Sequence, residues 1–271
     1  MPELPEVETT RRSLEPDLLG RRIMHVAVRE RRLRWPVPDE FERELTGANV
    51  ISLGRRAKYL LMTTDRGTAI VHLGMSGSLT LTRTARPPLK HDHVDIILDN
   101  GGMLRYHDPR RFGSIHWCRS FPENHMLLAG LAPEPLSEAF DGPYLHGITR
   151  RRSAAIKQVI MNGSLVTGVG NIYASEALHH AGINPRTPAR RLSLARCTRL
   201  VASVRHTLAR AIAAGGSTLR DYVDGSGNPG YFQMESAVYG RNGQGCPRCG
   251  TTVRMIRQGQ RATYFCPGCQ H

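Results

Sequence analysis

The pattern of apolar and polar positions divides the chain into three stretches, and the first begins with a helix. Pro near the start, with Glu3, Glu6 and Glu8 in the first turns, is typical of a helix N-terminus, where negative charge meets the positive end of the helix dipole. We therefore predict a helix over Pro2–Leu19. Pro16 fits poorly in a helix interior, so the helix is expected to end or kink near it.

From residue 21 to residue 117 the chain carries short alternating runs separated by Gly, Pro, Asp and Asn. The runs are Ile23–Arg29, Lys58–Thr63, Thr68–Leu73, Ser78–Arg83, His93–Leu98 and Met103–Tyr106. The sequence Asp99-Asn100-Gly101-Gly102 between the last two predicts a hairpin. Many short strands at this spacing predict a β-sandwich or a barrel.

A Pro-rich passage around residues 130–144 marks a boundary, and beyond it the apolar period becomes helical. The predicted helices are Ser153–Met161, Asn171–Ala181, Ser193–Ala214 and a short segment after Ser217. Val223–Tyr231 is rich in Gly and is predicted to be a flexible loop. The chain is thus predicted to be an α+β multidomain protein. Its predicted parts are a helix plus β-sandwich (1–130), a helical domain (131–222), a loop or linker (223–235) and a cysteine hairpin (236–271).

Four cysteines near the C-terminus have the spacing of a metal site. Cys246 and Cys249 form one C-x2-C pair, Cys266 and Cys269 form another, and 16 residues separate the pairs. This spacing predicts one tetrahedral zinc ion, which is structural because four sulfurs leave no position for a substrate. Two disulfides are the alternative, although nothing in the sequence indicates secretion.

The hairpin between the pairs is predicted from strands at Thr251–Met255 and Ala262–Phe265. Its tip carries Arg257, Gln260 and Arg261 without acidic neighbours, which favours contact with phosphate. The two other cysteines, Cys118 and Cys197, are isolated and are expected to be buried free thiols.

Composition indicates a polyanionic partner. The formal net charge is +14, and residues 131–271 contribute +10 of it. A pI near 10.2 with dispersed Arg is typical of a nucleic-acid-binding protein. Of the 37 basic residues 34 are Arg. Codon bias is the first explanation of this ratio, and phosphate binding by the bidentate guanidinium is the alternative. The apolar content of 40% excludes whole-chain disorder. No apolar run approaches the ~18 residues of a membrane span, and the start is not a secretory signal, so a cytoplasmic protein is expected. The protein is also expected to be a monomer.

The N-terminus offers a nucleophile. Removal of Met1 before a small residue would leave Pro2 with a free secondary amine, and an α-amino group titrates near ~8. A helix N-terminus disfavours the ammonium form and lowers that pKa further. A neutral amine attacks electrophilic carbon and forms an iminium with a sugar aldehyde, and Glu3 is placed to move protons. Ordinary helix capping is the alternative for these residues.

Several motifs combine in order along the chain. They are Pro2-Glu3-Leu4-Pro5-Glu6-Val7-Glu8-Thr9, Arg55-Arg56-Ala57-Lys58-Tyr59-Leu60, His72-Leu73-Gly74-Met75-Ser76-Gly77, Lys90-His91-Asp92-His93-Val94, Asp108-Pro109-Arg110-Arg111-Phe112-Gly113, Gly168-Val169-Gly170-Asn171-Ile172-Tyr173 and the four-cysteine hairpin. Together they closely resemble the bacterial formamidopyrimidine-DNA glycosylase family (Fpg/MutM) over nearly the whole chain. The resemblance implies a helix–two-turn–helix fold for the central domain and a zinc finger for the last.

The resemblance also implies an activity and its residues. The family excises oxidised purines, chiefly 8-oxoguanine and formamidopyrimidines, from duplex DNA in base-excision repair, and then nicks the strand by β,δ-elimination. Pro2 corresponds to the nucleophile and Glu3 to the acid. Lys58 corresponds to the lysine of β-elimination, and Arg261 to the arginine of δ-elimination and phosphate binding.

The base to be removed must leave the stack, and other side chains must fill the gap. By resemblance Met75 and Phe112 are apolar wedges, and Arg110 pairs with the base left opposite; core packing is the alternative for Met75 and Phe112. The positions that correspond to DNA contacts are His91, Arg110, Arg152 and Asn171. Asn171 follows a Gly-rich turn that could also belong to a nucleotide-binding loop, but no Gly-Lys-Ser/Thr follows it. The segment 216–231 corresponds to the family's loop over the extruded base.

The sequence leaves two alternative functions and one alternative site to consider. A Nei-type glycosylase for oxidised pyrimidines typically begins Pro-Glu-Gly-Pro, whereas this chain has Leu4. A catalytically silent DNA-binding protein with a zinc module is disfavoured by Pro2, Glu3 and Lys58. Finally, His91 and His93 could indicate a metal site, but alternation within a strand explains them more simply.

Overall fold

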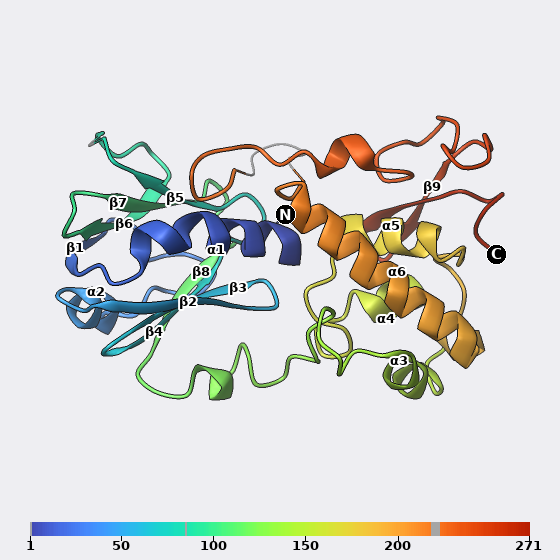
Figure 1. The fold of residues 1–271 in the computed structure, drawn as a ribbon, viewed down its shortest axis with the longest axis horizontal. Coiled ribbons are helices and arrows are strands. Elements are labelled where there is room, and N and C mark those ends of the chain that lie inside the picture. Colours follow the sequence, from blue (N-terminus) through green and yellow to red (C-terminus); the bar gives the residue numbers. More distant parts are fainter. Residues whose placement is uncertain (1, 85, 218–222) are drawn as a thin grey trace. The chain divides into compact units, whose positions relative to one another are not determined.

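A computed structural model of the chain describes residues 2–84, 86–217 and 223–271. It has two compact units, coloured along the chain in Figure 1. The first unit combines Met1–Ala129 with Ala214–Gln233, and the second combines Gly130–Ala213 with Met234–His271. The segment after the longest helix therefore packs with the N-terminal part of the chain. Among the described residues, none of the helices has both the length and the apolarity that a bilayer crossing needs.

The first unit is a β-sandwich of two antiparallel four-stranded sheets. One sheet has the order β1-β6-β7-β5 and the other has the order β2-β3-β4-β8. The strands of the first sheet are β1 (Ile23–Val28), β5 (Ser78–Thr82), β6 (Asp92–Leu98) and β7 (Met103–His107). Those of the second are β2 (Val50–Arg56), β3 (Tyr59–Thr64), β4 (Gly67–His72) and β8 (Ser114–Cys118).

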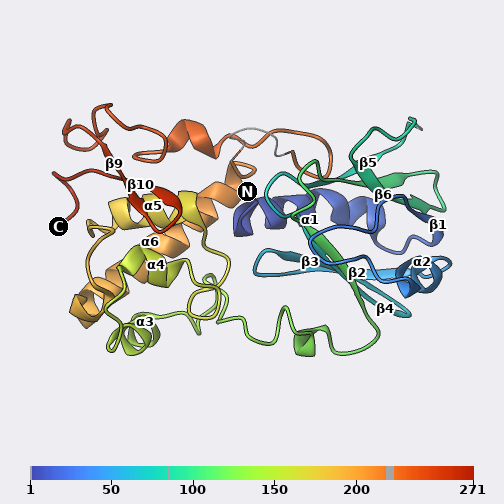
Figure 2. The same ribbon diagram turned by 180° about the vertical axis from the view of Figure 1, so that it is seen from behind.

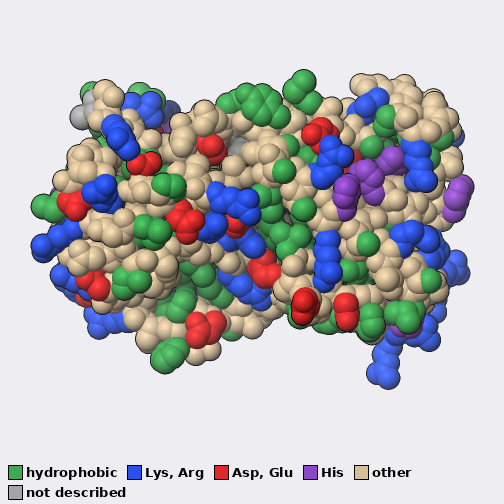
Figure 3. All heavy atoms as spheres, viewed as in Figure 1, with side chains coloured by type: hydrophobic (Ala, Val, Ile, Leu, Met, Phe, Trp, Pro, Cys, Tyr) green, Lys and Arg blue, Asp and Glu red, His purple; other side chains and the backbone are tan. Residues whose placement is uncertain are grey.

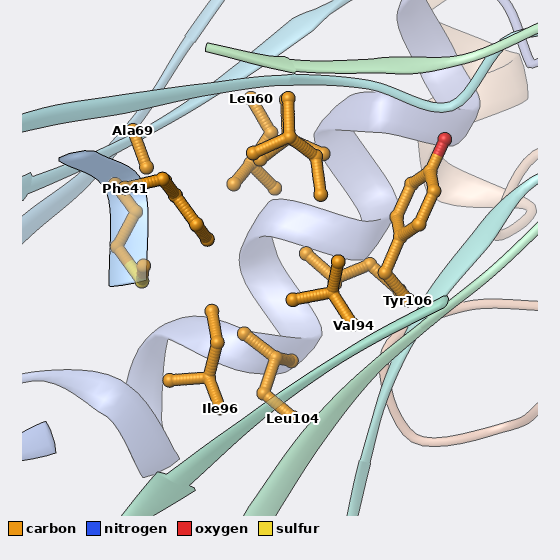
Figure 4. A pocket seen from close by; sticks show the side chains of 11 residues that line it. Phe41, Leu60, Ala69, Val94, Ile96, Leu104 and Tyr106 are labelled. Atoms are coloured by element: carbon orange, nitrogen blue, oxygen red, sulfur yellow. The ribbon is translucent and has the colours of Figure 1, made fainter. Parts of the chain in front are cut away.

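The core of this unit lies between the two sheets. Figure 4 shows side chains such as Leu60 from β3 and Val94, Leu104 and Tyr106 from β6 and β7 pointing into one apolar space. The cavity left there is about 10 Å³, and its lining is almost wholly apolar. Such dense packing makes the sandwich a rigid support for the loops at its ends.

Helix α1 (Leu4–Leu18) packs its apolar side against the sandwich. Leu4, Val7, Leu14 and Leu18 are buried and recur at helical spacing. The helix continues through Pro16 and ends two residues later. A proline so near the end removes only one hydrogen bond of the last turn, which explains why it is tolerated.

The second unit is helical, with a β-hairpin against it. Its helices are α3 (Gly142–Thr149), α4 (Ile156–Ile160), α5 (Asn171–His180) and α6 (Leu194–Ala213). The hairpin consists of β9 (Arg254–Gln258) and β10 (Arg261–Phe265), paired from Gln258 opposite Arg261. Figures 1 and 2 both place this hairpin beside α5.

Several elements differ from the sequence-based prediction. The short helix α2 (Glu40–Leu45) lies between two predicted strand runs, Ile23–Arg29 and Lys58–Thr63, where no helix was predicted. Helix α3 was not predicted because Pro143 was interpreted as part of a boundary. Pro143 instead occupies the first turn, where its missing N–H costs nothing, and Asp141 accepts the Tyr144 N–H at 2.7 Å. Cys197 is buried as predicted, but Cys118 is half-exposed. The predicted helix after Ser217 lies outside the described residues.

Candidate functional site

Two buried carboxylates, Glu3 and Glu6, lie at the N-terminal end of α1. Pro2 is buried, and the Glu3 and Glu6 side chains are each 2% exposed. Glu6 accepts the Glu3 N–H at 2.7 Å and, through its other oxygen, the Ser217 N–H at 2.8 Å. Glu6 thus holds the backbone of Glu3, next to Pro2, and also the backbone of Ser217. A sequence pattern could show the helix start but not this second role.

Lys58 lies in the tight turn between β2 and β3. The turn is fixed from α1, because Glu8 pairs with Arg55 at 3.1 Å and Arg55 donates to the Ala57 carbonyl at 3.0 Å. Burial raises the pKa of Glu8, but hydrogen bonds from Arg11 and Arg12 lower it more, so Glu8 is ionised. His72 lies close enough to Lys58 for their charges to interact. Burial first, and the Lys58 charge second, lower the pKa of His72 to about 4.

Met75 and Phe112 lie on two neighbouring loops and are exposed. Their exposed fractions are 41% and 44%, so neither is a core residue. The Arg110 guanidinium lies 4.7 Å above the Phe112 ring. The loops touch through their backbones: a Cβ on Gly74, whose φ is +65°, would lie 2.4 Å from the Gly113 nitrogen. Only glycine permits this approach.

Asp108 joins these two loops and was not singled out from sequence. It is fully buried, and its carboxylate accepts the Gly113 N–H at 2.8 Å and the Arg110 N–H at 3.3 Å. It also accepts the hydroxyl of Ser76 at 3.3 Å, one residue beyond Met75. Asp108 thereby fixes both loops with one carboxylate.

The histidines near Lys90 do not assemble a metal site. His91 lies just before β6, and its ring meets those of His93 and His107 edge-on at 6.3 and 6.0 Å. The His93 Nε2 bonds to the Asp108 carbonyl oxygen at 2.8 Å, and His107 bonds to Asp92. Within the described residues, the cysteines alone form a cluster of three or more potential metal ligands.

In the second unit a groove of about 240 Å³ runs along the hairpin tip, and Arg261 and Asn171 line it. Lys157 lines the same groove but is 1% exposed. Its Nζ donates to the Asn171 Oδ1 at 2.7 Å and to the Thr263 hydroxyl at 2.9 Å. The Asn171 amide in turn donates to the Ala262 carbonyl at 3.0 Å. Lys157 therefore places Asn171 and the hairpin together. Arg152, by contrast, is exposed outside this groove.

Basic side chains are scattered over the faces of both units seen in Figure 3 rather than gathered in one patch. Histidines cluster on the second unit, where the rings of His180 on α5 and His206 on α6 lie 5.9 Å apart. On the face that Figure 3 shows, the distribution of basic side chains therefore does not single out a binding site.

The four cysteines converge as predicted. All four sulfurs lie within 4.8 Å of one another, with separations such as 3.9 Å for Cys246–Cys269 and 3.5 Å for Cys249–Cys266. Bonds of about 2.3 Å in a tetrahedron place sulfurs about 3.8 Å apart, so the cluster fits one zinc ion. None of the six cysteines forms a disulfide.

Glu176 is a second buried carboxylate that sequence reasoning missed. It accepts the N–H groups of Ala237, Val238 and Tyr239 at 2.8, 3.1 and 2.7 Å. Burial raises the pKa of Glu176 despite these bonds. The Tyr239 hydroxyl reaches Asn171 at 3.3 Å, so Glu176 helps to place the groove. Its signal in the sequence is that Glu176 is the one carboxylate of this helix, with Ala174, Ala177 and Leu178 close to it.

Comparisons with known proteins agree with this arrangement along the whole chain. Residues 1–115 match the formamidopyrimidine-DNA glycosylase N-terminal domain, 131–223 match its H2TH domain, and 243–271 match the zinc finger found in FPG and IleRS. The chain belongs to the formamidopyrimidine-DNA glycosylase family. Its four cysteines are therefore the site of one structural zinc, and the α+β architecture with a helix–two-turn–helix domain is confirmed.

Relatives within the formamidopyrimidine-DNA glycosylase family are similar over their full length. The enzymes of Stutzerimonas stutzeri and Methylococcus capsulatus are 57% and 54% identical, with 100% of each chain covered. The crystal structure of MutM (Fpg) from Thermus thermophilus is 40% identical, with a TM-score of 0.89, and the match covers 99% of this chain and 98% of that one. Lactococcus lactis Fpg in complex with abasic-site DNA is 35% identical, with a TM-score of 0.92 and 99% of each chain covered. These matches favour the oxidised-purine branch over the Nei alternative.

Proposed function

We propose that this chain is a bifunctional DNA glycosylase and AP lyase of base-excision repair that excises oxidised purines from damaged duplex DNA. Its full-length similarity to formamidopyrimidine-DNA glycosylases supports the glycosylase activity. The main support for the proposed mechanism is the position of Pro2, which lies at the N-terminus of α1 next to the buried carboxylates of Glu3 and Glu6.

The first step is attack by the Pro2 nitrogen after Met1 has been removed. The nitrogen lone pair forms a bond to the sugar C1′ while the bond from C1′ to the base breaks, and Glu3 supplies the proton that the sugar or the departing base needs. Loss of the remaining N–H proton and opening of the sugar ring give an iminium between Pro2 and C1′. The iminium draws electrons from C2′, which makes the C2′ proton removable.

Strand cleavage follows from that acidity. Removal of the C2′ proton expels the 3′ phosphate, and a second elimination expels the 5′ phosphate; water then releases the sugar fragment from Pro2. We assign Lys58 to proton transfer in the first elimination. We assign Arg261 to the second, where its guanidinium neutralises the phosphate that leaves.

The damaged nucleotide must be extruded for Pro2 to reach C1′. We propose that Met75 and Phe112 enter the vacated space and that Arg110, stacked on Phe112, meets the opposite base. Exposed apolar side chains on rigid loops suit this role because they lose little freedom on binding. His91, Arg152 and Asn171 are proposed to bind the DNA backbone, with Asn171 at the N-terminus of α5 in the groove beside Arg261.

Borohydride trapping tests the proposal. Reduction of the iminium should yield a covalent adduct with an 8-oxoguanine duplex. A Pro2→Gly variant, and protein that retains Met1, should lose cleavage but keep DNA affinity. Pro5→Ala, in the first turn of the same helix, is the matched control and should still trap. An adduct formed equally well by protein that retains Met1 would show that the Pro2 nitrogen is not the nucleophile. Faster excision of thymine glycol than of 8-oxoguanine would favour the Nei-type hypothesis instead.

A further inference from the structure

His179 makes a contact with the zinc site that the reaction does not use. It is the penultimate residue of α5 and is 3% exposed. Its Nε2 lies 3.3 Å from the Sγ of Cys246, across 67 residues of sequence. This is hydrogen-bond distance for nitrogen and sulfur, so a helix of the central domain reaches a metal ligand of the C-terminal one.

The surroundings of the ring decide which nitrogen carries the proton. The His179 Nδ1 is buried and has no hydrogen-bond partner among the described residues. A proton there would be a buried donor without an acceptor, and the Nε2 lone pair would face the lone pairs of sulfur. A proton on Nε2 removes both costs, because the donor then points at the sulfur of Cys246.

We propose that His179 is a positioning residue for the zinc centre, which it serves by donating its Nε2–H to the thiolate of Cys246. Four thiolates around Zn²⁺ leave a net charge of −2, and a donor aimed at one sulfur stabilises that charge. Outer donors of this kind orient ligands and slow their loss from the metal.

A second side chain, Gln270, also joins the cysteine hairpin to the region after α5. The Gln270 side chain accepts the Cys266 N–H at 2.7 Å and donates to the Ile183 carbonyl at 2.9 Å. His179 and Gln270 therefore attach the two cysteine pairs to the region around the end of α5. His180, the next residue, is exposed and lies against His206 instead, so the two adjacent histidines have different surroundings.

Zinc release from the full-length, zinc-loaded protein tests the proposal. His179→Phe keeps an aromatic ring but removes the N–H, and it should release zinc to a chromogenic chelator on the order of 10-fold faster. His179→Gln restores an N–H at a similar reach and should release zinc at nearly the original rate. His180→Ala is the matched control and should leave the rate unchanged. An unchanged rate in His179→Phe overturns the proposal, and so do equally fast rates in the Phe and Gln variants, because packing alone would then explain the effect.

A measurement on the unaltered protein covers the case in which His179→Phe does not fold. Nitrogen-15 spectra of the histidine rings identify which nitrogen bears the proton. The zinc-loaded protein should show His179 with its proton on Nε2. A His179 ring protonated only on Nδ1 would refute the hydrogen bond, whatever the variants do.

Discussion

Replacing Asp108 by Asn should weaken the first unit and loosen both exposed loops. The carboxylate accepts the N–H groups of Gly113 and Arg110 at 2.8 and 3.3 Å, and the hydroxyls of Ser76 and Tyr106 at 3.3 and 3.4 Å. An amide offers one oxygen and one NH2, so in either orientation a backbone donor faces another donor. A hydrogen bond to a charged group contributes ~1.5–3 kcal/mol, so we expect the free energy of unfolding to fall by about 2 kcal/mol.

Tryptophan fluorescence during urea unfolding measures this change selectively. The chain has two tryptophans, Trp35 and Trp117, and both belong to the first unit. Asp99→Asn is the matched control: Asp99 is exposed and its nearest ion pair, with Arg21, spans 4.0 Å, so its loss should cost no more than ~0.5 kcal/mol. If Asp108→Asn unfolds at the same urea concentration as the control, the carboxylate does not join the loops as argued. If it is less stable but binds abasic-site DNA as tightly as before, the proposed role of those loops fails instead.

Three further outcomes are expected. Burial raises the pKa of Asp95, but the hydrogen bond from Arg105 and the other bonds to this carboxylate lower it more, so its folded-state pKa lies below the unfolded value. The ionised Asp95 carboxylate therefore contributes to the free energy of unfolding above pH ~4, and this contribution is lost as the pH falls further. Urea unfolding between pH ~3 and ~7 should show a stability that declines below pH ~4, and Asp95→Asn should reduce the decline. Equal declines in the variant and the original protein would refute this reasoning. Lys157→Met should lower the free energy of unfolding by ~2–4 kcal/mol, because it removes the donor that Lys157 offers to the Asn171 oxygen. Hydrogen exchange of the β10 amides should accelerate. Unchanged exchange would contradict the packing described. Zinc removal should expose residues 238–271 to protease while the first unit stays protected. If residues 238–271 are cleaved no faster without zinc than with it, the hairpin does not depend on the metal.

Local sequence signals predicted most elements because their causes are local. The start of α1, the period of α6 and the hairpin between β6 and β7 depend on residues within a few positions of one another. The errors have local causes as well. Pro143 begins a helix as readily as it ends one, and α2 is only six residues long, too short for its period to stand out among strands.

Some residues of the candidate site could likewise be predicted from local signals, and others could not. The spacing of the four cysteines predicted a zinc site before any fold was known, because a two-residue gap lets both sulfurs of a pair reach one metal. The positions of Pro2 and Glu3 at a helix start were equally apparent. No spacing indicated that Met75 and Phe112 would be exposed, and core packing was a reasonable alternative for both until the loops were seen.

The sequence by itself indicated the candidate reactive groups, the metal ligands and the order of the domains. Only the tertiary structure decided which polar groups hold them in place. Glu6 reaches Ser217, Glu176 reaches Tyr239 and His179 reaches Cys246, each across more than 60 residues. The physical reason is that a buried carboxylate or imidazole needs a partner in space, and the chain can bring that partner from any distance along the sequence.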